Sequence, residues 1–242
     1  TDAITIAYLD NTWPVNNLPL TTLARNGSSI TVDTGKFDTA GNPDPAGRAY
    51  DDPVYGTKVG DVLMITNQWG TAVGTVTGIG AAGSILLAAR DPLNLNQPGA
   101  ANGNISALKT PTTNVYPVTS AARINVVTYF INTAGPDGVD GTPDDIPVLM
   151  RQLNAQPAIP IAENVQNLQL TYDTYDSSAI APATPYTAGE LGNAVTNPSQ
   201  IRKINVQLTL QSQFSTPGGR PQTLTVSTAV APRDLSFTNR YQ

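Results

Sequence analysis

The sequence predicts a mainly β fold, made of antiparallel sheets with long loops and little helix. Thr occurs 31 times and Asn 20 times, whereas Glu occurs twice and Lys four times. Thr fits the half-buried surface of a strand, and Glu and Lys are residues that helices favour. Twenty Gly and twenty Pro supply frequent turns. Several segments also alternate apolar and polar residues, as strands do. We expect a single domain over residues 1–242, with a possible subdivision near 91–122.

The first half of the chain contains short apolar or alternating runs that are bounded by turn residues. We expect strands at Ala3–Leu9, Ser29–Val32, Asp61–Thr66, Thr71–Thr77 and Ser84–Ala88. The last three are separated by a tight turn and a Gly-rich bend, which indicates a meander. The segment Asp91–Pro117 is rich in Asn, Pro and Gly and is predicted to be a loop.

The second half contains longer runs. We expect strands at Arg123–Asn132, Val148–Leu153, Leu168–Tyr175, Ile201–Ser212 and Gln222–Ala231. The last two alternate regularly, which is typical of antiparallel strands with one wet face. Ala162–Val165 is predicted to form one helical turn, and Asp176–Pro198 is predicted to be a loop.

Composition argues against the commonest catalytic sites. The chain has no Cys and no His, so it lacks thiolate nucleophiles, Ser-His-Asp catalysis and His-ligated metals. Carboxylate, Lys, Tyr or Ser chemistry would remain. The net charge is -5 and no basic run exceeds Arg202-Lys203, which argues against a nucleic-acid partner. We expect a non-catalytic protein.

An Asp-rich loop, 135–147, contains the sharpest local motif. Its four carboxylates, separated by glycines, are those of Asp137, Asp140, Asp144 and Asp145. Calcium binds six to eight oxygen ligands, which a short Asp/Gly loop can supply. The pattern predicts a possible Ca²⁺ site, although it lacks the EF-hand spacing. The alternative is a solvated turn in which the Asp side chains accept hydrogen bonds from their own backbone.

Three further residue sets have a functional and a structural interpretation. The aromatic residues Trp13, Trp69 and Tyr55, with Tyr50 and Tyr116, predict a platform for glycans or a partner protein, or else ordinary core residues. Asp51-Asp52 fits a glycosidase acid and base, or a solvated loop. Arginines near the C-terminus fit a DNA-binding stripe, which the acidic total disfavours.

Several short segments, taken in order, resemble a known family. They are Val126–Ile131, the L-x-R strand Leu149–Arg151, Ile161–Asp173, the I-R-x-I-x-V-x-L strand Ile201–Leu208, and the closing segment Val226–Tyr241. Together with Thr1–Thr5 and Gly60–Leu63, they resemble minor pilins of the PilW type and, more distantly, the J-type pseudopilins of type II secretion. The resemblance covers most of the chain in segment order.

This resemblance implies a pilin-like headgroup with a non-enzymatic role in the filament of a type IV pilus or a type II secretion pseudopilus. The partners would be other major and minor pilin subunits, at a tip or priming position. The family's membrane-spanning N-terminal helix is missing from the sequence, and it would anchor the protein in the inner membrane before assembly. The location would then be an extracellular, cell-surface filament. The alternative is a calcium-binding, adhesin-like β domain of a secreted surface protein.

Overall fold

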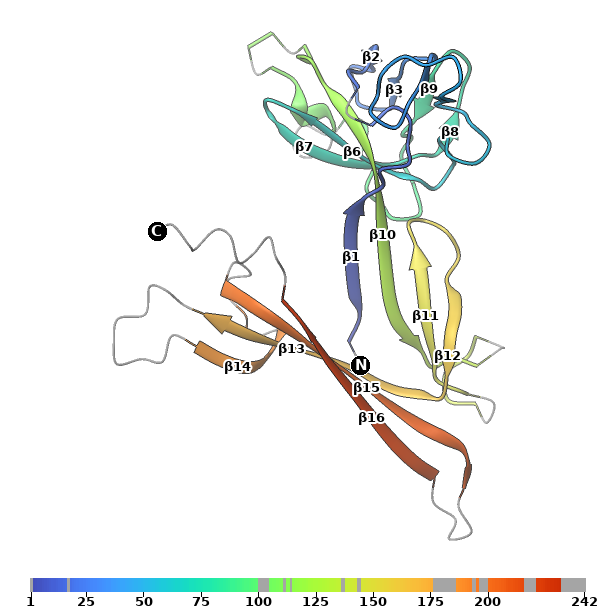
Figure 1. Ribbon diagram of the computed structural model, residues 1–242, viewed down its shortest axis with the longest axis vertical. Helices are drawn as coiled ribbons and strands as arrows, with labels where there is room; N and C mark the ends of the chain where they lie inside the picture. Colours follow the sequence, from blue (N-terminus) through green and yellow to red (C-terminus); the bar gives the residue numbers. More distant parts are fainter. Residues whose placement is uncertain are drawn as a thin grey trace. The chain divides into compact units, whose positions relative to one another are not determined.

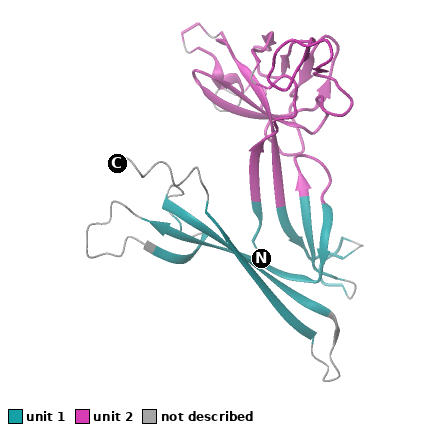
Figure 2. Ribbon diagram, in the orientation of Figure 1, with its two compact units in different colours: residues 1–4, 129–151, 159–242 teal, residues 5–128, 152–158 magenta. Residues whose placement is uncertain are grey.

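The computed structural model describes residues 2–16, 18–99, 105–110, 112–113, 115–135, 138–142, 145–175, 186–192, 195, 200–215 and 221–231. The chain divides into two compact units (Figure 2). Unit 1 contains residues 1–4, 129–151 and 159–242, and unit 2 contains residues 5–128 and 152–158. No boundary between the units falls within residues 91–122.

The prediction of a mainly β fold is confirmed. The described elements are strands apart from one short 3₁₀ helix (Figure 1). The strands are β1 (Ile4–Leu9), β2 (Thr22–Leu23), β3 (Ser29–Thr31), β4 (Lys36–Phe37), β5 (Arg48–Ala49), β6 (Val62–Asn67), β7 (Gly70–Thr75), β8 (Gly78–Ile79), β9 (Ser84–Leu86), β10 (Ser120–Asn132), β11 (Val148–Leu153), β12 (Ile159–Glu163), β13 (Val165–Tyr175), β14 (Tyr186–Leu191), β15 (Ile201–Ser215) and β16 (Pro221–Val230), and the helix is η1 (Ile105–Leu108). A helix of the length and hydropathy needed to cross a membrane does not occur among the described residues.

Unit 2 contains two main groups of paired strands. The hairpin β6–β7 closes with Asn67 opposite Gly70, and β10 pairs with β6 over Ser120–Ile124. β1 also pairs with β10. The second group has the order β2-β3-β9-β8, and all its pairs are antiparallel. The expected meander is therefore wrong in its last step, because β9 leaves the β6–β7 hairpin and pairs with β3 and β8.

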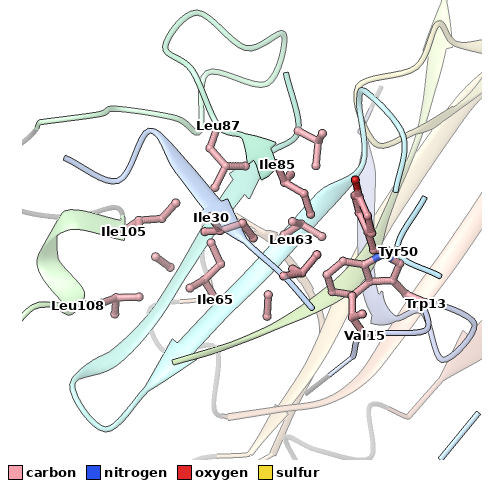
Figure 3. Packing of buried hydrophobic residues seen from close by; sticks show 14 of the residues in the cluster. Trp13, Val15, Ile30, Tyr50, Leu63, Ile65, Ile85, Leu87, Ile105 and Leu108 are labelled. Carbon is pink, nitrogen blue, oxygen red and sulfur yellow. The ribbon is translucent and has the colours of Figure 1, made fainter. Parts of the chain in front are cut away.

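Both groups contribute side chains to one hydrophobic core (Figure 3). Leu63 and Ile65 of β6 point the same way, two residues apart, and are fully buried. Ile30 and Ile85 face them from β3 and β9. η1 adds Ile105 and Leu108 at one end of the core, and Trp13, Val15 and Tyr50 lie at the other. The loop 91–117 thus covers part of the core with a helical turn that its composition did not indicate.

A buried arginine joins three segments of unit 2. Arg123 of β10 donates from Nε to Asp10 Oδ2 at 2.9 Å and from Nη1 to Asp61 Oδ2 at 3.2 Å. Nη1 also donates to the carbonyl oxygen of Gly56 at 2.7 Å, and Nη2 donates to Thr12 Oγ1 at 3.2 Å. The residue is 7% exposed. A buried guanidinium is stable only when it is paired. These contacts therefore hold the segment after β1 and the loop before β6 against β10.

A second buried polar group ties the loop after β9 to β7. Asp91 Oδ2 accepts from Thr75 Oγ1 at 2.7 Å, and Asp91 Oδ1 accepts from the Asn96 backbone N at 2.7 Å. The Asn96 side chain accepts from the Thr75 backbone N and donates to the Thr75 carbonyl oxygen. Burial raises the pKa of Asp91, but the hydrogen bonds outweigh it and the pKa lies below its ordinary value. The carboxylate therefore stays charged and bonded within the structure.

Unit 1 contains an antiparallel sheet with the described strand order β14-β13-β15-β16. Leu168, Leu170 and Tyr172 of β13 face Leu208, Val206 and Ile204 of β15. Asp173, 2% exposed, bonds to Lys203 Nζ at 2.6 Å and accepts from Asn205 Nδ2 at 2.9 Å on the opposite face of the sheet. A hairpin of β11 and β12 also belongs to this unit over Val148–Arg151 and Ile159–Glu163.

Two local expectations were wrong. Ala162–Val165 does not form a helical turn, because β12 ends at Glu163 and β13 begins at Val165. Asn164 between them adopts a left-handed conformation with φ of 59°, which turns the chain from one strand to the next. The segment predicted as a loop, 176–198, contains β14, which pairs with Thr171–Tyr175 of β13.

Removing the centre of the core should destabilise unit 2 strongly. We expect Ile65→Ala to lower the free energy of unfolding by about 2–5 kcal/mol, because it leaves a cavity among fully packed side chains. Trp13 and Trp69, the two tryptophans of the chain, both lie in unit 2, so tryptophan fluorescence in urea reports this unit. The matched control is Ile79→Ala at a position that is 40% exposed, for which we expect under about 1 kcal/mol. Equal losses in the two variants would contradict the assignment of the core.

Removing the buried guanidinium should be equally severe. We expect Arg123→Met to lower the free energy of unfolding by about 3–5 kcal/mol, because Asp10 and Asp61 lose their cation. Arg25→Met, at an exposed arginine of the same unit, should change it by less than about 0.5 kcal/mol. Adding Asp10→Asn and Asp61→Asn to Arg123→Met should restore part of the loss.

The same variant gives a prediction for pH. Burial raises the pKa of Asp10. The hydrogen bonds from Thr12 and the charge of Arg123 lower it by more than burial raises it, so the pKa lies below its ordinary value. A carboxyl group whose pKa is lowered by folding stabilises the folded state when the pH is above its pKa in the unfolded chain, about 4. This stabilisation is lost as the pH falls through the pKa of the folded state. The difference between the parent chain and Arg123→Met should therefore narrow below about pH 4. A constant difference would argue against this charge pairing.

Candidate functional site

The Asp-rich loop after β10 uses its described carboxylates to bind its own chain. Asp145 Oδ1 accepts from the backbone N of Gly135 at 2.9 Å, and Asp145 Oδ2 accepts from that of Gly141 at 2.6 Å and of Thr142 at 3.1 Å. These hydrogen bonds, Gly135 first, hold the pKa of Asp145 below its ordinary value. Asp140 Oδ1 accepts from Thr133 Oγ1 at 2.6 Å. Asp145 thus anchors the backbone of the loop, and Asp140 binds the side chain of Thr133.

The other half of the predicted calcium set, Asp137 and Asp144, lies outside the described residues. Within the described part of the chain, no group of three or more acidic side chains is arranged to hold a metal ion. An oxygen that accepts an N–H bond has one lone pair fewer for a cation. The described geometry thus matches the solvated-turn interpretation, and the calcium site stays a prediction.

The carboxylates of the acidic loop between β4 and residue 55 also accept hydrogen bonds from their own backbone. Asp38 Oδ1 accepts from the backbone N of Ala40 and of Asn42, each at 2.8 Å. Asp52 Oδ1 accepts from the backbone N of Val54 and of Tyr55, each at 2.9 Å. Hydrogen bonds from Asn42 and Tyr55 respectively are the main causes that lower the two pKa values. Asp52 thus forms a turn with the backbone, and the glycosidase interpretation of Asp51-Asp52 stays a prediction.

The predicted aromatic platform is not assembled from all its members. Trp13 is 2% exposed, and its indole N–H donates to Thr57 Oγ1 at 3.1 Å inside the core (Figure 3). Trp69 lies in the β6–β7 turn and is 47% exposed. Tyr55 is half-buried, and the guanidinium of Arg48 lies 3.4 Å from its ring centroid. Trp13 is therefore a core residue, while Trp69 and Tyr55 remain accessible.

A hollow of about 440 Å³ lies in unit 1 beside the edge of β13, lined by Asp2, Ala3, Gln169, Leu170, Tyr172, Leu191 and Gly192. The charged group in its lining is already bonded: Asp2 Oδ2 accepts from the Leu170 backbone N at 2.7 Å and from Gln169 Nε2 at 2.9 Å. The Asp2 backbone N also donates to the Leu168 carbonyl oxygen. Asp2 thus ties the start of the chain to β13, and its carboxylate is engaged in that role.

The sequence predicted a strand at β16 but did not mark it as a functional surface. Its ten residues are all exposed. The signal was present in the sequence, since Gln222–Ala231 alternates apolar and polar residues and contains no charged residue. Alternation predicted a strand there, but it could not show that the strand ends the sheet. Comparisons with protein-family models, with curated proteins and with solved structures found no match to this chain.

The calcium prediction has a direct test in thermal stability. If the loop binds Ca²⁺, the unfolding midpoint by calorimetry should be higher in millimolar calcium than in a chelator, because a ligand of the folded state stabilises it. The combined change Asp140→Asn and Asp145→Asn should abolish this difference, and Asp38→Asn in the other acidic loop should leave it unchanged. Identical midpoints of the parent chain in calcium and in chelator would exclude the site.

Proposed function

We propose that the chain is the non-enzymatic headgroup of a filament subunit, a minor pilin of a type IV pilus or a pseudopilin of type II secretion. The observation that carries the proposal is the sheet of unit 1. The segments that carry the resemblance are separated in sequence, yet those around Leu168–Asp173, Ile201–Leu208 and Val226–Val230 form the adjacent strands β13, β15 and β16. These three resembling segments thus share one sheet.

The sheet also has the two different faces that a packed headgroup needs. One face carries Leu168 and Leu170 on β13, Val206 and Leu208 on β15, and Val226 on β16. The opposite face carries polar residues, for example Gln207 opposite Ser227, and the ion pair of Asp173 with Lys203. The apolar face is buried at β13 and becomes exposed at β16. An apolar surface that continues to the edge of a sheet is typical of a site for packing against another chain.

The other resembling segments support the proposal in the same way. Val126–Ile131 lies in β10 and Leu149–Arg151 lies in β11, and these two strands pair. These two segments are therefore neighbouring strands. In this proposal the partners are other pilin subunits, and the apolar face of the β13–β16 sheet is the surface offered to them.

The native protein in its source cells tests the proposal. We expect its intact mass and N-terminal sequence to include an apolar helix of about 20 residues before Thr1, long enough to span a bilayer. We also expect an antibody to the chain to detect it in sheared surface filaments, and only in the membrane fraction when filament assembly is blocked. Recovery of a protein with a globular domain before Thr1 would favour the adhesin-like alternative. If the chain still reached the cell exterior when filament assembly is blocked, the result would contradict the proposal.

A further inference from the structure

In the described part of the chain, β16 is the outermost strand of the unit 1 sheet. It pairs with β15 on one side, and among the described residues no strand pairs with its other side. Figure 1 shows β15 and β16 as a long twisted hairpin. All ten residues of β16 are exposed. A row of outward backbone N–H and C=O groups on such an edge is a template for another strand.

This edge lacks the features that usually prevent strand addition. Natural edge strands are protected by charged side chains, internal proline, bulges or short length. From Gln222 to Ala231 the sequence contains no Asp, Glu, Lys or Arg. The pairing with β15 is regular from Thr223 to Val230, and Pro221 stands only at the first position. The edge is therefore long, regular and uncharged.

The apolar face of the sheet continues onto this strand. Leu224, Val226 and Val230 are 62%, 49% and 55% exposed. They lie opposite Leu210, Leu208 and Ile204 of β15, which are half-buried. Thr223, Thr225 and Ser227 occupy the other face. A strand that adds to β16 must therefore present apolar residues at alternate positions and small polar residues between them.

We propose that β16 pairs antiparallel with β16 of a second copy of the chain. In a two-fold antiparallel pair, facing residues share a face of the sheet, so Leu224 meets Val230 or Thr228 and never a charged group. The chain carries a net charge of -5, which opposes contact between copies at most surfaces. β16 carries none of this charge, so the repulsion is smallest there. The strand is thus its own complement in both pattern and charge.

The size of the contact predicts weak association. The two registers pair residues 224–230 or 222–230, so seven to nine residues at about 3.3 Å each give a strip about 23–30 Å long, and a sheet about 10 Å thick then buries about 230–300 Å² on each copy. Stable complexes bury about 800 Å² on each partner. The dimer should therefore form at high concentration, or where another contact already holds two copies close together. This inference does not depend on the filament proposal.

Cysteine cross-linking of the purified chain tests the pairing. The chain has no Cys, so every disulfide comes from the introduced residue. Single changes to Cys at positions 224 to 228 would be oxidised at high protein concentration. The residue on the two-fold axis faces its own copy at a Cα distance of about 4.5–5.5 Å, whereas its neighbours lie about 8 Å from their copies, beyond the reach of a disulfide. We expect one position to give most of the covalent dimer.

Two controls distinguish a specific β16 pair from disulfides that form by random collision. Val118→Cys lies in unit 2 and its side chain is 81% exposed, so it reports random disulfide formation. A lysine at an adjacent position of β16, added to the reactive Cys variant, should reduce the cross-link to the Val118→Cys level. Similar yields at all β16 positions and at Val118, or no dimer at any of them, would overturn the proposal. If the same Cys in source cells joined only a different protein, the edge would belong to that partner and not to a second copy.

Discussion

The pairing of Arg123 organises unit 2. One guanidinium contacts Asp10, Asp61 and the Gly56 carbonyl oxygen, while the backbone N of Arg123 donates to Asn16 Oδ1. A buried cation without these partners would be strongly unfavourable. The segment after β1 and the loop before β6 therefore both bind β10 through this residue. The hydrophobic side chains supply most of the favourable energy, and the arginine holds the surrounding segments together.

The same chemistry recurs in the loops of the chain. All but two of its 18 acidic residues are Asp, and an Asp side chain is short enough to accept a hydrogen bond from the backbone N two residues later. Asp38, Asp52 and Asp91 accept such bonds. Asp145 instead accepts from the backbone N of Gly135 and of Gly141, which lie earlier in the chain. These bonds lower the carboxyl pKa values, since they favour the charged form. In a chain without disulfides, Asp therefore orders the long connections, and a cluster of Asp is weak evidence for a metal or a catalytic pair.

The sequence was most informative where a strand is long and alternates. β15 and β16 follow directly from their pattern, and β11 begins and ends as predicted. Local pattern failed where the partner decides the structure. Ala162–Val165 has residues that suit a helix, but pairing with β11 and β15 makes the segment extended on both sides of Asn164. For the candidate sites, composition could not distinguish Trp13 in the core from Trp69 on the surface, because burial depends on contacts distant in sequence.

The edge of β16 and the acidic loops have opposite roles in how copies of the chain meet. Bound carboxylates keep their charge in the folded state, so the loops maintain repulsion between copies at neutral pH. A neutral edge of about ten residues gives a directional contact that is too small to act alone. Assembly would then require a second contact that raises the local concentration, such as a shared filament axis. A larger neutral surface would associate in any orientation, whereas a single edge admits only a strand of matching pattern.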